Sequence, residues 1–304
     1  KGKAAVHCVI VGFGLQDVAE KTIFEYENIK GEALAVPVSN INPYLVDAPD
    51  LVLEKRNQPI CIVPTISYGS MANDDGHLLL DKEQRNALIA AEPATAPYIR
   101  RYMGAQEFLN NAERWCLWLK DISPSLMRSS NELRHRIEAV RKFRASSNRE
   151  ATRNLAATPS LFGEDRQPLK SYLLLPKVSS ENRPYMPIGF MPSEVIANGS
   201  ALTISDSGHY EMGVLQSKMH MAWMRAVAGR MKSDYQYSAQ IVYNNFPWPD
   251  LPEKLEPNQP QTPTHKAQAA IEKAAQAVLD ARAQFPGSSL ADLYDPLTMP
   301  PALL

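Results

Sequence analysis

The sequence has no long apolar run and few cysteines. None of its apolar segments approaches the roughly 18 residues of a membrane-spanning helix, and its first residues lack a signal-peptide pattern. Cys8, Cys61 and Cys116 are scattered without Cys-x-x-Cys spacing, which is typical of reduced thiols rather than of disulfides or a zinc site. We therefore expect a cytoplasmic protein that does not contact a membrane.

Enzyme motifs are missing as well. The sequence contains no Walker loop, no Gly-x-Ser-x-Gly elbow and no His-Glu-x-x-His pair. Its six histidines stand far apart, so each is expected to be a core or surface residue and not a metal ligand. We therefore predict no catalytic, cofactor-binding or metal-binding residues in this chain.

Two short strings come close to cofactor or methyl-transfer motifs. In "VHCVIVGFG", which ends at Gly12 and Gly14, Asp17 stands where a dinucleotide loop needs its third glycine, so we expect a buried strand ending at a turn. The string "NPY" at 42–44 resembles the Asn-Pro-Pro-aromatic turn with which amino-group DNA methyltransferases hold a flipped base. It lacks the second proline, and we interpret it as an ordinary turn.

The chain does have the composition of a folded protein and an uneven charge distribution. Its 304 residues are 44% hydrophobic and 21% charged, enough for one large domain or two smaller ones. Residues 128–232 hold 16 basic and 9 acidic side chains, whereas the remainder holds 16 and 24. A basic block on a nearly neutral chain is typical of a surface that contacts phosphates, although basic runs alone are explained more simply by a solvated helix face.

Hydrophobic periodicity predicts an α+β fold. Residues 40–76 are rich in Pro, Asn, Asp and Gly and should form a long irregular connection with short strands. Met219, Met221 and Met224 are expected to fill a helical core. The predicted strands cover 6–11, 21–27, 113–121 and 200–205, with a hairpin or meander over 171–192; the predicted helices cover 81–93, 129–159 (one or two), 211–231 and 266–286. An Asp cap should begin the helix at 81–93 and Ser caps the helical segment at 129–159, whose apolar residues are Leu133, Ile137, Val140 and Phe143.

Five long strings, in order along essentially the whole chain, resemble the C-terminal part of MmeI-like (type IIL) restriction-modification enzymes. They are "INPYLVDAPDLVLEKRNQPI", "PYIRRYMGAQEFLNNAERWCLWL", "YLLLPKVSSENRPYMPIGF", "MHMAWMRAVAGRMKSDYQYSAQIVYNNFPWP" and "LADLYDPLTMPPALL". In that family one polypeptide joins an endonuclease, an adenine-N6 methyltransferase that uses S-adenosylmethionine, a target-recognition domain and a helical C-terminal domain. The chain also begins abruptly, so we expect the cofactor and catalytic motifs upstream of Lys1.

The resemblance implies an organisation and a function. Residues 1–30 would end the methyltransferase domain, 31–212 would form the target-recognition domain, and 213–304 the helical C-terminal domain. The chain would recognise a specific double-stranded DNA sequence and position one adenine for upstream catalytic domains, with S-adenosylmethionine and Mg²⁺ needed only by the full-length parent. That parent would be an adenine-specific DNA methyltransferase with type II restriction endonuclease activity.

Two other functions remain open. The chain could be a structural or interaction module that docks on the rest of its own polypeptide. An independent nucleotide-binding enzyme would rest only on Gly12 and Gly14.

Two groups of residues are the candidate DNA contacts. An arginine-rich helical segment should contact phosphates, and a strand should present side chains to base edges, because residues at a period of two share one face. Glu181 and Arg183 could instead form a surface ion pair on an ordinary hairpin or belong to a buried framework. The candidates for phosphate contact are Arg134, Arg141, Lys142, Arg144, Arg149 and Arg153; those for base readout are Lys177, Ser179, Glu181 and Arg183, with Asn182 if a bulge turns it inward.

Overall fold

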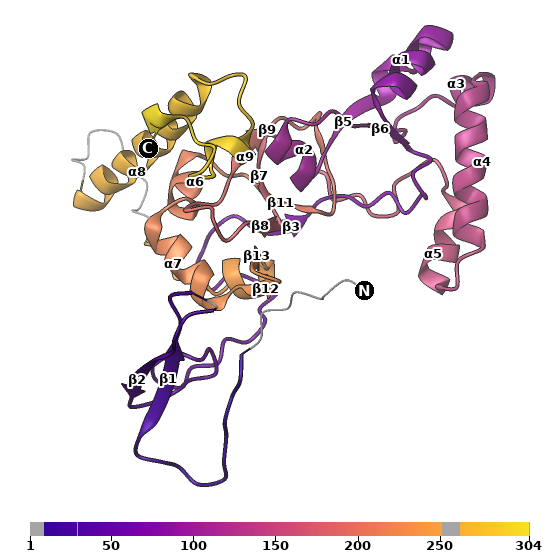
Figure 1. Ribbon diagram of the computed structural model, residues 1–304. Helices are drawn as coiled ribbons and strands as arrows, with labels where there is room; N and C mark the ends of the chain where they lie inside the picture. Colours follow the sequence, from indigo (N-terminus) through magenta and orange to yellow (C-terminus); the bar gives the residue numbers. More distant parts are fainter. Residues whose placement is uncertain (1–8, 29, 251–261, 304) are drawn as a thin grey trace.

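The computed structural model describes residues 9–28, 30–250 and 262–303 and confirms a mixed α+β fold with several small sheets (Figure 1). Its helices are α1 (Lys82–Ala91), α2 (Ala105–Asn110), α3 (Pro124–Ser129), α4 (Asn131–Ala145), α5 (Glu150–Asn154), α6 (His209–Leu215), α7 (Lys218–Val227), α8 (Pro263–Ala283) and α9 (Leu290–Leu293). Short helical segments of other types are η1 (Pro93–Tyr98), η2 (Leu155–Ala157), η3 (Ala239–Tyr243) and η4 (Pro301–Leu303).

The strands are short, and most of them pair antiparallel. They are β1 (Lys21–Glu25), β2 (Leu34–Val38), β3 (Ile66–Tyr68), β4 (Leu79–Leu80), β5 (Ile99–Met103), β6 (Trp115–Leu117), β7 (Tyr172–Pro176), β8 (Val178–Ser179), β9 (Gly189–Met191), β10 (Ile196–Ala197), β11 (Ala201–Ser205), β12 (Gly229–Met231) and β13 (Asp234–Gln236). They form four sheets, with the orders β1-β2, β10-β5-β6-β4, β3-β11-β7-β9 and β12-β13-β8.

The largest core lies around the sheet β3-β11-β7-β9. Strand β7 is buried along its whole length, since both of its faces are covered. The hydrophobic cluster around this sheet includes Leu173 and Leu175 of β7, Met212 of α6 and Ala275 of α8. Helix α8 therefore completes the same core as the central sheet. The predicted domain boundary at 212–213 stays a prediction, with cluster members on both of its sides.

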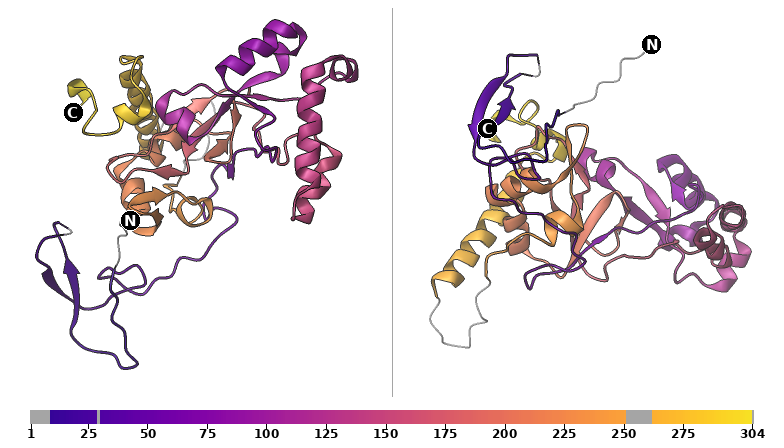
Figure 2. Two further views of the ribbon diagram at one scale, coloured as in Figure 1. Left: turned by 45° about the vertical axis from the view of Figure 1, so that its right-hand side comes forward. Right: turned by 90° about the horizontal axis from the view of Figure 1, so that it is seen from below.

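A second core holds α4 against the sheet β10-β5-β6-β4. Leu133, Ile137 and Val140 of α4 pack in one cluster with Trp115 and Leu117 of β6. Strand β6 confirms only the centre of the strand predicted at 113–121. The predicted Ser-capped helix is confirmed, with the Ser130 hydroxyl accepting a hydrogen bond from the backbone N–H of Leu133. In Figures 1 and 2, α4 and α5 lie at one end of the molecule and α8 at the other.

The start of the described chain differs from the expected buried strand at 6–11. Residues 6–8 lie outside the described residues, whereas Val9, Ile10 and Val11 form no strand and are 74%, 101% and 52% exposed. A strand needs a hydrogen-bonding neighbour, and these three residues pair with no strand among the described residues. The predicted strand at 21–27 is confirmed as β1, whose hairpin with β2 stands apart from the other sheets (Figure 1).

The expected single helix over 211–231 is two helices, α6 and α7. The helix is interrupted at Gln216 and Ser217, because the Ser217 hydroxyl accepts a hydrogen bond from the N–H of His220 and starts a new helix. Met221 and Met224 are buried as expected, but Met219 is 69% exposed because the new helix turns it outward.

Two further expectations agree with the structure. The segment 40–76 is largely irregular and contains only the short strand β3, and the Asn42-Pro43-Tyr44 string is a turn. The Asn42 side chain is buried and accepts hydrogen bonds from the N–H groups of Tyr44 (2.9 Å) and Val46 (3.3 Å). Among the described helices, none is both long and apolar enough to cross a bilayer.

Candidate nucleic-acid interface

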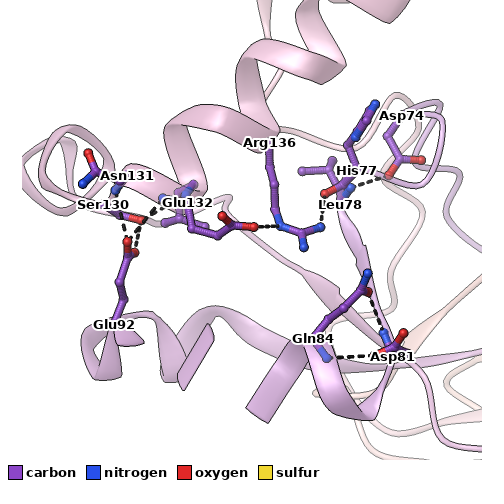
Figure 3. Close-up of polar contacts among 11 residues, drawn as sticks. Asp74, His77, Leu78, Asp81, Gln84, Glu92, Ser130, Asn131, Glu132 and Arg136 are labelled. Carbon is purple, nitrogen blue, oxygen red and sulfur yellow. Dashed lines mark hydrogen bonds and ion pairs between the residues drawn. The ribbon is translucent and has the colours of Figure 1, made fainter. Parts of the chain in front are cut away.

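Polar contacts at its first turn fix the position of helix α4 (Figure 3). The Glu92 carboxylate, at the end of α1, accepts hydrogen bonds from the N–H groups of Asn131 (3.1 Å) and Glu132 (3.2 Å) and from the Ser130 hydroxyl. A carboxylate at a helix N-terminus satisfies free N–H groups and interacts favourably with the helix dipole. The arginine-rich helix is therefore anchored to α1 at its first turn.

A second set of contacts ties α4 to the loop at residues 73–78. Arg136 pairs with Glu132 (Nε to Oε1, 2.7 Å) and donates to the backbone carbonyl of His77 (3.0 Å), as drawn in Figure 3. Within the loop, the buried Asp74 carboxylate accepts a 2.6 Å hydrogen bond from the N–H of Leu78. The helix and this loop thus form one rigid unit.

Arg144, an expected phosphate contact, lies inside the protein. Its side chain is fully buried, and its guanidinium donates to five backbone carbonyls, at 2.8 to 3.0 Å. Burial lowers the pKa of Arg144, while the nearby Asp74 opposes that shift. The sequence interpretation placed Phe143 in the apolar stripe of α4, but Arg144 continues the spacing of Leu133, Ile137 and Val140, and Phe143 is 37% exposed.

The other five basic candidates of this segment are exposed. The Arg134 guanidinium donates to the Asn131 side chain (2.6 Å), and Arg141 pairs with Glu138 (3.3 Å). Arg153 donates to the carbonyl of Ser147 (2.9 Å). The side chains of Lys142 and Arg149 have no hydrogen-bond or ion-pair partner among the described residues.

An open cleft lies beside this segment. The loop 73–76 lines one side, where Asn73, Asp75 and Gly76 have positive φ angles of 50°, 53° and 84°. Asn, Asp and Gly tolerate this left-handed conformation better than other residues. Arg114 and Arg149 line the cleft as well, so its wall carries charges of both signs.

The strand expected over 177–183 is shorter than its alternation predicts. Strand β8 ends at Ser179, and a turn follows in which the N–H of Arg183 donates to the carbonyl of Ser180 (3.2 Å). Ser179 is 2% exposed because it lies opposite Tyr235 of β13, and its hydroxyl has no hydrogen-bond partner among the described residues. The four alternating candidates therefore do not share one exposed face.

The turn itself presents three polar side chains from adjacent positions. Glu181 and Asn182 are exposed, and no ion pair of the described residues joins Glu181 to Arg183. Arg183 is half-buried, and its Nε is buried without a partner. Burial lowers the pKa of Arg183, which the carboxylates of Asp295 and Asp234 partly oppose. We call residues 181–183 the polar turn.

Lys177 lies at the bend before β8. It is exposed, and its ammonium lies 5.1 Å from the centroid of the Tyr68 ring. This is cation–π distance, which holds the side chain over β3.

The polar turn offers the donors and acceptors that distinguish base pairs. A free carboxylate accepts from the amino group of cytosine, a guanidinium donates to the two acceptors of guanine, and an amide pairs with adenine. By contrast, the described residues contain no group of three or more His, Cys, Asp or Glu side chains that could hold a metal ion.

Sequence patterns did not single out three basic residues near the polar turn. Arg225 of α7 donates to the carbonyl of Pro184 (3.5 Å), and Arg230 and Lys232 lie on the β12–β13 hairpin beside β8. For Arg230 and Lys232, the signal available in the sequence was the string "AGRMKSD", a short polar interruption after a helix.

Comparison with known proteins identifies the class of protein. Residues 47–250 match the model of the MmeI target recognition domain, and residues 263–304 match that of the MmeI C-terminal domain. The chain therefore belongs to the family of MmeI target recognition domains.

Two relatives extend this result. DNA methyltransferase A of Bacillus subtilis (strain 168) is 37% identical over 301 residues, which are 99% of this chain and 32% of that protein. The solved structure of the type IIL restriction-modification enzyme MmeI in complex with DNA matches with a TM-score of 0.87 and 45% identity, over 95% of this chain and 37% of the other. The chain thus spans about a third of the length of either relative.

Proposed function

We propose that this chain is the module of a larger DNA methyltransferase and restriction enzyme that recognises a specific sequence in double-stranded DNA. The observation that carries the proposal is the polar turn, which holds an unpaired carboxylate, an amide and a guanidinium at adjacent positions of a target recognition domain. The likeness to MmeI, which was solved in complex with DNA, supports it. The module would position one adenine for catalytic domains elsewhere in the polypeptide.

The candidate contacts divide into two roles. Phosphate contacts supply affinity and register, whereas contacts to base edges supply discrimination. Glu181, Asn182 and Arg183 are the proposed base contacts, and Lys177 beside them is a further candidate. The proposed phosphate contacts are Arg134, Arg141, Lys142, Arg149 and Arg153.

The β1–β2 hairpin joins residues on both sides of the predicted boundary between 30 and 31, and its exposed surface supports a neighbouring domain upstream. An isolated two-stranded hairpin is at best marginally stable, and β1–β2 leaves Phe24 and Leu34 60% and 65% exposed. We propose that residues 1–30 complete the sheet of an upstream methyltransferase domain, which would bind S-adenosylmethionine, while the nuclease would use Mg²⁺. Cys61 and Cys116 are free thiols, which agrees with action in the cytoplasm.

A charge reversal in the intact enzyme tests base readout. In Glu181→Lys/Arg183→Asp, we expect the enzyme to methylate a site that differs at one base pair, because a bidentate base contact contributes about 1 to 3 kcal/mol of discrimination. The matched control is Lys120→Asp/Asp165→Lys, which reverses an exposed ion pair elsewhere (2.8 Å). Sequencing the methylated sites distinguishes the outcomes. If a well-folded variant keeps its recognition sequence, neither residue reads a base. If the variant has a lowered Tm and no new specificity, both residues belong to the structural framework.

A second candidate function is an interaction module that docks on the rest of its polypeptide. The exposed apolar residues of the β1–β2 hairpin favour it. Electrophoretic mobility at two salt concentrations separates the two functions, because phosphate binding weakens steeply with salt and apolar docking does not.

A further inference from the structure

The β12–β13 hairpin is an exposed basic element next to the polar turn. Strand β12 lies at the edge of its sheet, and Gly229, Arg230 and Met231 are all exposed. Lys232 follows in the turn with a φ of 58°, which bends the chain back into β13. Strand β13 pairs directly with β8, the strand that leads into the polar turn.

The arginines of this region are held in place. The Arg230 guanidinium lies 3.8 Å from the centroid of the Tyr235 ring and donates to the carbonyl of Ser233 (3.0 Å). Tyr235 is only 5% exposed, so the stack rests on a fixed ring. Arg230 also makes a long contact (3.5 Å) to the carbonyl of Arg225, which in turn contacts Pro184 beside the polar turn. The two guanidinium groups are therefore oriented in advance relative to that turn.

These charges are not neutralised by the protein. Arg225, Arg230 and Lys232 form no ion pair with any described carboxylate. A cluster of three exposed positive charges attracts anions. A basic edge strand could also serve only to prevent edge-to-edge aggregation, in which case DNA binding would not depend on it.

The spacing of the sheet fits a duplex backbone. Ser179, Tyr235 and Arg230 lie opposite one another on three neighbouring strands. Neighbouring strands are about 4.8 Å apart, so the Cα atom of Arg230 lies about 10 Å from that of Ser179, two residues before the polar turn. The major groove is about 12 Å wide. A side chain that reaches into the groove therefore has the phosphates along the groove edge at a distance of the same order as the strand separation above.

We infer that Arg230 and Lys232, with Arg225, bind backbone phosphates of the duplex beside the polar turn and so set its register on the DNA. The inference rests on the proposed function, because it requires that the chain binds double-stranded DNA. This clamp of Arg225, Arg230 and Lys232 is separate from the basic residues of α4 and α5, because α4 packs in the other core.

The test measures the affinity of the protein for a random-sequence duplex and for its target duplex between about 50 and 200 mM salt. The variant Arg230→Gln/Lys232→Asn removes two charges, with Asn chosen because it tolerates a positive φ. The control Lys266→Gln/Lys273→Gln removes two exposed charges from α8. We expect the slope of log K against log salt to fall by about two units in the hairpin variant, with equal loss for both duplexes, and to stay unchanged in the control.

Two single variants separate a lost contact from a lost fold. Lys232→Asn leaves the Arg230–Tyr235 stack intact and should lower the slope by about one unit, while Arg230→Lys should keep the wild-type slope because it keeps the charge. If the hairpin variant has the same salt slope and affinity as the control, the three residues do not bind phosphates, and the proposed function is unaffected. A wild-type protein that binds no duplex at all overturns the proposed function and the clamp with it.

Discussion

Replacement of Arg144 should destabilise the fold rather than weaken direct contacts with DNA. In Arg144→Ala, five backbone carbonyls lose their hydrogen-bond donor inside the protein, among them those of Ala72, Asn73 and Leu161. A hydrogen bond to a charged group contributes about 1.5 to 3 kcal/mol, and bonds that share one group do not add fully. The loss of the side chain's volume adds a cavity beneath α4.

The expected loss is large for a single substitution. We expect the free energy of unfolding to fall by about 4 to 5 kcal/mol, a major part of the roughly 5 to 15 kcal/mol that stabilise a typical domain. Arg144→Lys keeps the charge but has one nitrogen where Arg144 has three, so it should lose about half as much. Urea unfolding followed by the fluorescence of Trp115 and Trp118 reports on the same core.

The neighbouring exposed residue supplies the control. Arg141→Ala removes an exposed arginine from the same helix and should change stability by no more than about 0.5 kcal/mol. If Arg144→Ala had the urea midpoint of Arg141→Ala and a reduced salt dependence of DNA binding, Arg144 would be a phosphate contact and its structural role would be refuted.

Three other substitutions have defined outcomes. Burial lowers the pKa of His220 to about 3 from its ordinary 6.5, so the stability that its neutral form contributes is complete above pH 6.5 and is lost as the pH falls toward 3. The free energy of unfolding should fall by about 1.4 kcal/mol for each pH unit below 6.5. Urea unfolding between pH 5 and 7 should show this fall in the wild-type protein and not in His220→Gln. Glu92→Ala removes three hydrogen bonds from the first turn of α4 and should lower the free energy of unfolding by about 1 to 2 kcal/mol, whereas an unchanged melting temperature would contradict that role. Lys142→Ala should weaken binding equally for all duplex sequences and lower the salt slope by about one unit, and unequal loss would make Lys142 a reader.

Local patterns predicted most helices and their first turns. Asp81 and Ser130 cap α1 and α4 as the sequence indicates. A cap is a local interaction between a side-chain oxygen and the N–H groups of the next few residues, so it can be predicted without knowledge of distant contacts. The burial of Arg144 was within reach of the same reasoning, since it lies eleven residues after Leu133 on the buried stripe of α4. The interpretation failed because it chose the apolar Phe143 over the position that the helical period demands.

The polar turn depends on contacts between distant parts of the chain. Alternation alone predicted one continuous face from Lys177 to Arg183, but Ser179 pairs with Tyr235 and the strand ends there. No pattern within 171–192 indicates that partner. Residues 229–231 of β12 were expected to end a helix, and β13, which supplies Tyr235, was not predicted. The candidate readers were therefore predictable as residue types, and their arrangement was not.

The most direct test of the central claim is selection of double-stranded DNA by the purified protein. A library of random duplexes is bound at low and at moderate salt, and the retained DNA is sequenced. We predict enrichment of one short sequence, together with total retention that falls steeply as salt rises, because phosphate contacts supply affinity and the polar turn supplies discrimination. Retention of DNA without enrichment of any sequence would contradict recognition, and no retention at either salt concentration would contradict DNA binding itself.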